Sequence, residues 1–155
     1  MTAPSTAPSS GSEAPAISGQ LATFRLDGDL YGIEVEHVQE VLRSQQLTRV
    51  PLAPTAVAGL INLRGQVVTA IELRERLGRP PRPEGTDPVV IVVRLHGEAV
   101  SMLVDSIADV VDVDASDFEA PPDTLEGQAR DLIRGAYKLS GTLLLALDVQ
   151  KAVSA

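Results

Sequence analysis

Short runs of alternating apolar and polar residues begin at Gln20 and continue almost to the end of the chain. Residues 20–26 alternate in this way, Asp27-Gly28 supplies a two-residue turn, and residues 30–35 continue the pattern beyond it. Alternation predicts strands with one buried face, and a turn that ends in glycine favours a tight hairpin. Three further hairpins of this kind are predicted, with turns at Arg64-Gly65, His96-Gly97 and Ser140-Gly141.

A different spacing predicts a short helix over residues 36–43, because Val41 and Leu42 follow Val38 at three and four residues. The apolar segment 47–50 is brief and ends at Pro51, since the residue before a proline is restricted. Helical turns are also predicted at two other places, residues 72–77 before Gly78 and residues 148–153 behind the capping residue Asp148.

Prolines divide the predicted strands into two groups. Neither a helix nor a central strand tolerates the prolines of residues 78–88, so a linker is expected near this segment. Each half shows the order hairpin, loop, hairpin and short helix, an internal echo that suggests duplication. About ten short strands in two groups predict an all-β fold with short helices, built as two small barrels or sandwiches. Residues 1–18, rich in Ala, Pro, Ser and Thr, predict a disordered tail before a folded domain at 19–155.

The composition excludes several classes of protein. With 13 basic residues against 21 acidic ones, a net charge of −8, the chain has little attraction for nucleic acid. The absence of cysteine excludes disulfides, thiolate metal sites and cysteine nucleophiles, and it fits a reducing cytoplasm. Apolar runs fall far short of the roughly 20 residues of a membrane helix, and the start lacks a signal-peptide pattern. We therefore expect a soluble, cytoplasmic protein.

The charge is distributed unevenly along the chain. Residues 105–131 contain nine acidic residues against Arg130 alone, so this window carries the whole excess of −8. Residues 43–82 contain seven arginines against Glu72 and Glu75, a local excess of +5. The hypothesis that follows is a polarised protein whose two charged regions orient partners or neighbouring copies.

Candidate catalytic and metal-binding residues are few. His37 and His96 are the only histidines, and the chain has neither a nucleophile elbow nor a phosphate-binding glycine loop. Asp112, Asp114 and Asp123 resemble part of a calcium loop, but Asp117 stands where that loop needs glycine. We expect no enzymatic activity, no metal and no cofactor. A metal-dependent or hydrolytic enzyme that uses the acidic stretch is the alternative from another class.

Several motifs in a fixed order carry a family resemblance. Asn62-Leu63-Arg64-Gly65 is the most distinctive, because Asn62 is the only asparagine in the chain. The others in the first half are Tyr31-Gly32-Ile33, Val38-Gln39-Glu40-Val41, Leu47-Thr48-Arg49-Val50-Pro51, Gly59-Leu60-Ile61 and Glu72-Leu73-Arg74. The second half adds Val89-Val90-Ile91-Val92, Leu103-Val104-Asp105-Ser106-Ile107-Ala108-Asp109-Val110 and Gly135. From Gln20 to Val153 the chain resembles the CheW family of bacterial chemotaxis coupling proteins. It departs from the family pattern at Thr69, Glu72 and Ser101.

The resemblance implies two five-stranded, SH3-like β-barrel lobes that are intertwined. It also implies a non-enzymatic adaptor that couples the cytoplasmic tip of methyl-accepting chemotaxis receptors to the regulatory domain of the histidine kinase CheA. Such an adaptor works in the cytoplasm at the inner membrane face, within receptor arrays, and contacts between CheW copies in rings are a further possibility. The alternative is the same scaffold in another chemosensory pathway, such as twitching or gliding motility or developmental signalling.

The resemblance also assigns candidate site residues. A receptor-binding groove between the lobes is expected to use an aliphatic floor and the charges of Glu40 and Arg64, which fix the register of a helical partner. Its expected residues are Val38, Glu40, Gly59, Arg64, Val89, Val90, Ile107 and Val110. Kinase contacts are expected near Leu47, Thr48, Arg49 and Val50.

Overall fold

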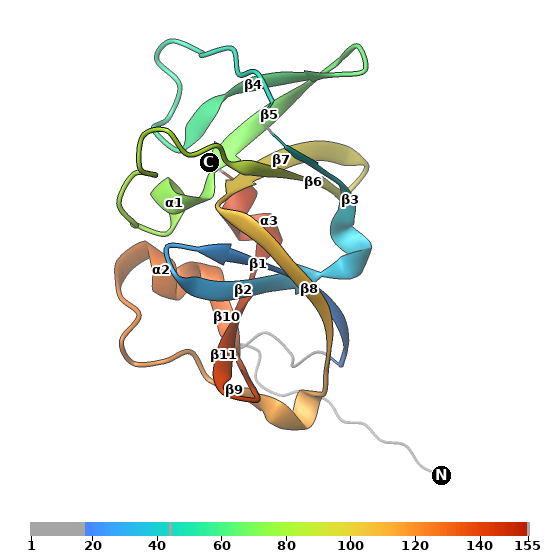
Figure 1. Cartoon of the computed structure of the whole chain (residues 1–155), viewed down its shortest axis with the longest axis vertical. Coiled ribbons are helices and arrows are strands. Elements are labelled where there is room, and N and C mark those ends of the chain that lie inside the picture. Colours follow the sequence, from blue (N-terminus) through green and yellow to red (C-terminus); the bar gives the residue numbers. More distant parts are fainter. Residues whose placement is uncertain (1–17, 44, 155) are drawn as a thin grey trace.

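A computed structural model describes residues 18–43 and 45–154, and the expected tail at 1–18 lies outside it except for Ser18. The chain forms two antiparallel-rich sheets, which lie one above the other in Figure 1. This arrangement confirms the predicted all-β fold with short helices. Within the described residues, no helix is long and apolar enough to cross a membrane.

The six-stranded lobe is the lower one in Figure 1, and its strand order is β8-β1-β2-β11-β10-β9. Its neighbours pair antiparallel except β2 and β11, which run parallel. The strands are β1 (Gly19–Leu26), β2 (Asp29–Glu34), β8 (Ser106–Val113), β9 (Phe118–Glu119), β10 (Ile133–Leu139) and β11 (Thr142–Leu147). The resemblance implied five strands here, and the short β9 is the addition.

The five-stranded lobe has the order β3-β6-β7-β5-β4, again with one parallel pair, β5 beside β7. Its strands are β3 (Val38–Arg43), β4 (Val57–Leu63), β5 (Gln66–Glu72), β6 (Val89–Leu95) and β7 (Glu98–Val104). Thr48 closes the sheet, because its backbone pairs with Leu60 of β4 through two hydrogen bonds of 2.8 and 2.9 Å. The segment predicted as a brief strand at 47–50 is therefore a single bridge.

The proline segment does not separate the two lobes. It connects α1 (Leu73–Arg76) to β6, and both of the elements that flank it lie against or within the five-stranded sheet. The first half of the chain gives β1 and β2 to the six-stranded lobe and β3–β5 to the other. The second half gives β6 and β7 to the five-stranded lobe and β8–β11 to the six-stranded one. The two halves of the chain thus do repeat a similar order of hairpins and short helices, but each half contributes strands to both lobes.

The helix predicted over residues 36–43 is wrong. Only Val35–His37 forms a turn of 3-10 helix (η1), and residues 38–43 form β3, whose half-buried and exposed residues alternate strictly. A β-bulge between Val38 and Glu40 shifts the register against β6. Spacing alone could not separate the two structures, because β3 is an edge strand that buries only part of one face. Pairing with β6 provides the backbone hydrogen bonds that decide for the strand.

The predicted hairpins and the two predicted helical turns are confirmed. All four hairpins have two-residue turns, and Asp27, Arg64 and His96 adopt positive φ angles of 51°, 53° and 50° before their glycines. Positive φ at both turn residues matches the twist of paired strands, which explains the glycines. The helical turns are α1, which ends before Gly78, and α3 (Val149–Val153), whose first turn is capped by Asp148. The 3-10 turn η2 (Ala115–Asp117) and the helix α2 (Gly127–Leu132) were not predicted from the sequence.

Three apolar clusters hold the fold together. One fills the five-stranded lobe around Ile61 and Val90, and a second fills the six-stranded lobe around Leu21 and Leu144. The largest lies between them and contains residues of both lobes, such as Phe24 of β1 and Met102 of β7. The two lobes therefore share a core, in addition to the interior that each sheet encloses.

Candidate functional site

The Glu40 and Arg64 side chains form a bidentate pair on the surface of the five-stranded lobe. Arg64 donates from Nη1 to Glu40 Oε2 over 2.7 Å and from Nη2 to Oε1 over 2.5 Å. Arg64 is 71% exposed while Glu40 is 18% exposed, so the pair is open to solvent from the arginine side. The hydrogen bond from Arg64 lowers the pKa of the Glu40 carboxyl. A fixed, charged pair at an accessible position suits recognition of a polar group on a partner.

The β4–β5 turn explains why Arg64 occupies this position. Asn62 accepts a hydrogen bond from the Gly65 backbone N–H over 3.0 Å, which closes the turn from the side chain. Arg64 itself holds the left-handed φ of 53°. Within the distinctive tetrad, Asn62 and Gly65 therefore shape the hairpin, while the Arg64 side chain extends from it to Glu40 of β3.

Ile107 and Val110 are the apolar part of the expected receptor surface, and both lie on β8. They are 42% and 52% exposed, and β8 is an edge strand of the six-stranded sheet. Val38, at the start of β3, is half-buried and packs against the shared core. Figure 1 shows β3 climbing from η1 into the upper lobe while β8 descends from β7 into the lower one. The expected receptor surface is thus divided between the two lobes.

Three of the expected receptor residues are buried instead. Val89 and Val90 of β6 are 9% and 1% exposed and belong to two different apolar clusters, so they do not form an exposed floor. Gly59 lies at a β-bulge of β4 with a φ of 156°, where a Cβ atom would stand 2.6 Å from the Thr48 carbonyl oxygen. Its role in the structure is close approach of two backbones, which closes the five-stranded lobe.

The segment expected to contact the kinase forms an exposed loop beside β4. Leu47 packs on the core of the five-stranded lobe, Thr48 makes the closing bridge, and Arg49 and Val50 are exposed. Next to them Leu52 is fully exposed, with a relative accessibility of 104% and a φ of 65°. A leucine held in the left-handed region costs about 1–2 kcal/mol relative to an unstrained residue. The sequence pointed to this loop through its prolines but contained no signal that singled out Leu52.

A network of partly buried ions joins the two lobes at Asp105, a residue to which the sequence motifs gave no role. Asp105 lies between β7 and β8, where the chain crosses from one lobe to the other. Arg74 of α1 donates to its carboxylate over 3.0 and 2.6 Å, and Arg82 of the proline segment donates over 3.1 Å. The backbone N–H of Asp27, in the β1–β2 turn, donates over 2.8 Å.

Further arginine contacts extend this network on both sides. Arg82 also donates to both carboxylate oxygens of Glu72 over 2.8 and 3.2 Å, so the departure from the family pattern at Glu72 is a member of the network. Arg79 donates to Asp29 and to the Tyr31 hydroxyl in the six-stranded lobe. The signal in the sequence was the excess of arginines in residues 43–82, three of which are placed here against acids of both lobes.

The network changes the acidity of Asp105. Burial raises the pKa of this carboxyl, but the hydrogen bonds from Arg74 and from the Asp27 backbone, with the charges of Arg74 and Arg82, lower it to about 2 from 3.8. The ionised carboxylate is therefore more stable in the folded protein than in the unfolded chain. Its contribution to stability is present above the unfolded value of 3.8 and is lost as the pH falls toward 2.

A pH-dependent stability difference is expected between the wild-type chain and the Asp105→Asn variant. Between pH 5 and pH 2, the free energy of unfolding of the wild type should fall by about 1 kcal/mol more than that of the variant, after allowance for solvent screening of a partly exposed group. Urea unfolding at several pH values measures this difference. If the free energy of unfolding depends on pH in the same way in both proteins, the ionised Asp105 carboxylate does not stabilise the folded state.

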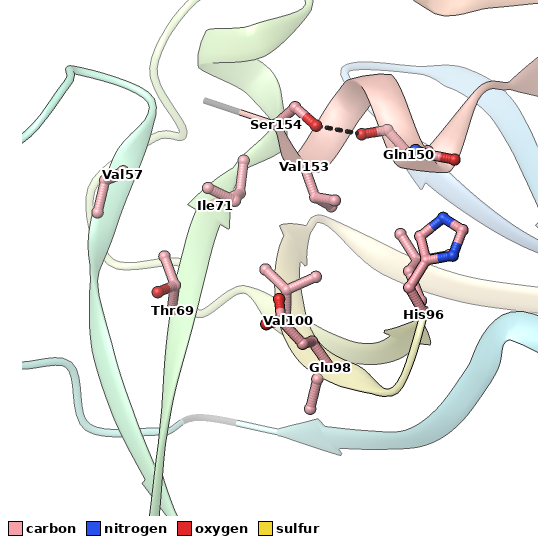
Figure 2. Close-up of a pocket in the computed structure, with 11 residues that line it drawn as sticks. Val57, Thr69, Ile71, His96, Glu98, Val100, Gln150, Val153 and Ser154 are labelled. Carbon is pink, nitrogen blue, oxygen red and sulfur yellow. Dashed lines mark hydrogen bonds between the residues drawn. The ribbon is translucent and has the colours of Figure 1, made fainter.

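The described residues also form a cavity of about 370 Å³ between the β5–β7 side of the five-stranded sheet and α3. Figure 2 shows Gln150, Val153 and Ser154 along the top of the cavity, His96 from the β6–β7 turn at the right, and Val57, Thr69 and Ile71 at the left. The Ser154 hydroxyl donates to the Gln150 carbonyl over 2.7 Å. Across residues 18–43 and 45–154, no three His, Asp or Glu side chains are grouped so that they could hold a metal ion. Asp114, from the calcium-loop alternative, instead accepts from the Ser116 backbone.

Comparison with known proteins identifies the family and agrees with the fold. The family model described as a CheW-like domain matches residues 20–155. A chemotaxis protein CheW of Treponema pallidum is 30% identical over 139 residues, which cover 87% of this chain and 82% of that protein. The corresponding protein of Bacillus subtilis is 30% identical over 129 residues, 83% of each chain. The crystal structure of the scaffolding protein TtCheW from Thermoanaerobacter tengcongensis superposes with a TM-score of 0.78 at 26% identity, covering 90% of this chain and 94% of that one.

Proposed function

This chain belongs to the CheW family, a family of chemotaxis scaffolds, and from that premise we propose that it couples chemoreceptors to the histidine kinase CheA without enzymatic activity of its own. The observation that carries the proposal is the accessible Glu40–Arg64 pair, because neither barrel needs a charged pair at this place. The exposed Ile107 and Val110 add apolar area of the kind that a helical partner buries.

The receptor partner is the cytoplasmic tip of a methyl-accepting chemotaxis receptor. Such a partner presents a helical surface on which apolar stripes alternate with charges, and this suits aliphatic contacts on β8 with Arg64 as the polar anchor. The protein then works at the inner face of the membrane, within receptor arrays, through its partners. Neighbouring copies of the chain can join the same arrays through contacts between lobes.

The kinase partner is assigned to the loop that contains Leu47, Thr48, Arg49 and Val50, and Leu52 extends this surface. Exposed apolar side chains that are held in a strained backbone are more often kept for binding than for folding. Val50 and Leu52 are the large apolar residues that this loop exposes. They lie in the loop that precedes β4, whereas Arg64 lies in the turn between β4 and β5.

The Leu52→Gly variant is expected to separate binding from stability. Glycine accepts a positive φ, so the free energy of unfolding should stay equal to that of the wild type or rise by about 0.5 kcal/mol. Affinity for the CheA regulatory domain should fall about tenfold, because an apolar anchor is lost. Calorimetry with the purified kinase domain measures the affinity, and receptor binding serves as the control. Unchanged kinase affinity would remove Leu52 from the interface.

Reconstitution tests the proposed function as a whole. The purified chain is mixed with the receptor fragment and CheA of the source organism, and kinase autophosphorylation is measured with and without receptor stimulus. We expect receptor control of the kinase only when the chain is present. Failure to bind both partners would overturn the proposal. Binding to the receptor and kinase of a motility or developmental pathway in preference to those of chemotaxis would favour the alternative pathway.

A further inference from the structure

We propose that Asp105 is a positioning residue for receptor binding: by joining the two lobes, its ionic network sets the geometry of a receptor surface that is divided between them. This inference rests on the proposed receptor function. Asp105 is not among the residues assigned to receptor or kinase binding. It is placed directly before β8, which carries Ile107 and Val110.

The location of the donors supports this role. Arg74 and Arg82 approach the carboxylate from α1 and from the proline segment, on the side of the five-stranded lobe. The Asp27 backbone N–H approaches it from the β1–β2 turn of the six-stranded lobe. The backbone N–H of Asp105 donates to the Arg25 carbonyl over 3.1 Å, which holds the start of β8 against β1. One carboxylate thus receives bonds from both lobes at the point where the chain passes between them.

Burial and geometry make these bonds directional. The Arg74 side chain is 8% exposed and the Arg82 side chain 10% exposed, so both guanidinium groups are held in place. Arg74 also donates to the Pro80 carbonyl over 2.8 Å, which ties the proline segment to the same cluster. No buried side-chain polar atom among the described residues lacks a hydrogen-bond partner. A fully satisfied network of this kind specifies one arrangement of the groups that it joins.

The shared apolar core alone does not define that arrangement. Apolar contact is non-directional, so the ionic bonds add an angular preference between the lobes that contact area alone does not supply. Two other directional ties remain without Asp105: Arg79 donates to Asp29 and to the Tyr31 hydroxyl, and Arg76 donates to the Ala152 and Lys151 carbonyls at the end of α3 over 3.0 and 2.7 Å. Removing the Asp105 charge should therefore widen the range of lobe orientations while the lobes stay together.

The proposed receptor surface has residues on both lobes, so receptor binding depends on how the lobes are oriented. Glu40 and Arg64 belong to the five-stranded lobe, whereas Ile107 and Val110 belong to the six-stranded lobe. A rigid helical partner that contacts both groups requires a fixed spacing between them. A chain that samples several orientations binds more weakly, because only part of the population is competent.

Spin-label distance measurement tests the inference, and the absence of cysteine from the chain makes specific labelling simple. Labels are attached through Gln66→Cys in the five-stranded lobe and Ser140→Cys in the six-stranded lobe. In the Asp105→Asn background we expect a broader distance distribution than in the parent. Unlabelled Asp105→Asn should bind the receptor fragment three- to tenfold more weakly. Asp123→Asn, which removes an exposed acid with the same charge, should change neither measurement.

The outcomes separate the inference from the proposed function. An unchanged distance distribution in Asp105→Asn, or a broader one with unchanged receptor affinity, would overturn the positioning role. If Asp105→Asn fails to fold, Arg82→Gln, which removes the donor from the proline segment, is expected to give the same changes at smaller amplitude. If the wild-type chain itself does not bind the receptor, the proposed function fails. The distances then still decide whether the network orients the lobes.

Discussion

Replacing Gly59 with alanine is expected to lower the free energy of unfolding by about 3 kcal/mol. The new Cβ atom would stand 2.6 Å from the Thr48 carbonyl oxygen, and Leu60 next to it donates to that same oxygen. Because the obstacle is backbone rather than a flexible side chain, the variant must move the bridge that closes the five-stranded lobe. Thermal or urea unfolding of the full chain measures the loss.

A second glycine serves as the matched control for this variant. Gly97 in the β6–β7 turn has a φ of 82°, and an added Cβ would meet no atom within 4 Å. Gly97→Ala should therefore lower the free energy of unfolding by about 1 kcal/mol, because alanine adopts the positive φ at a cost but meets no neighbouring atom. If Gly59→Ala costs no more than Gly97→Ala, the close approach of Thr48 does not constrain the position. Receptor affinity of Gly59→Ala, measured on the folded fraction, then decides whether Gly59 acts at the receptor surface as well.

Replacing Arg64 with alanine is expected to weaken binding to the receptor fragment about 10- to 100-fold while leaving the melting temperature nearly unchanged. The Arg64 side chain is 71% exposed, so its removal uncovers no core, and solvent can replace the guanidinium group at Glu40. Loss of a preorganised, bidentate anchor at a partner surface costs much more than loss of an exposed ion pair costs the free protein. Calorimetry of the variant with the receptor fragment and a thermal melt provide the two readouts.

The exposed Arg43 at the end of β3 offers a control of equal charge. Arg43→Ala should leave receptor affinity within about twofold of the wild type, since an unanchored surface charge contributes little. Arg64→Lys keeps the charge but loses the bidentate geometry, and it should recover only part of the affinity. Wild-type affinity in Arg64→Ala would remove this side chain from the receptor interface.

Local chemistry explains which parts of the fold could be predicted. The hairpin turns were predictable because a residue with positive φ followed by glycine is a requirement of the turn itself, as at Arg64-Gly65. The capping role of Asp148 was predictable for the same reason, since the cap bond to Lys151 N–H lies within one helical turn. Strand β3 was not, because its identity depends on pairing with β6, about 50 residues away in the sequence.

The candidate site also contains residues that sequence motifs could identify and residues that only the tertiary fold determines. Motif order found Glu40 and Arg64, and the structure brings these two together although they are 24 residues apart. Motif order could not distinguish the exposed Val110 from the buried Val90, because both are valines on strands. The network at Asp105 appeared in the sequence only as separate arginine-rich and acid-rich stretches. Which charges meet is decided by the crossing of the chain between lobes, and that is a property of the tertiary fold.

The division of each half of the chain between both lobes has a consequence for synthesis and folding. Strand β1 pairs with β8, as in Phe24 with Ile107, and β2 pairs with β11, so the contacts that complete the six-stranded lobe are far apart in the sequence. Pairings of this kind raise the contact order and slow the folding reaction. A nascent chain that has reached the proline segment holds strands of both lobes but cannot complete either sheet. Native assembly therefore awaits the second half, and the two lobes gain their stability in one cooperative step.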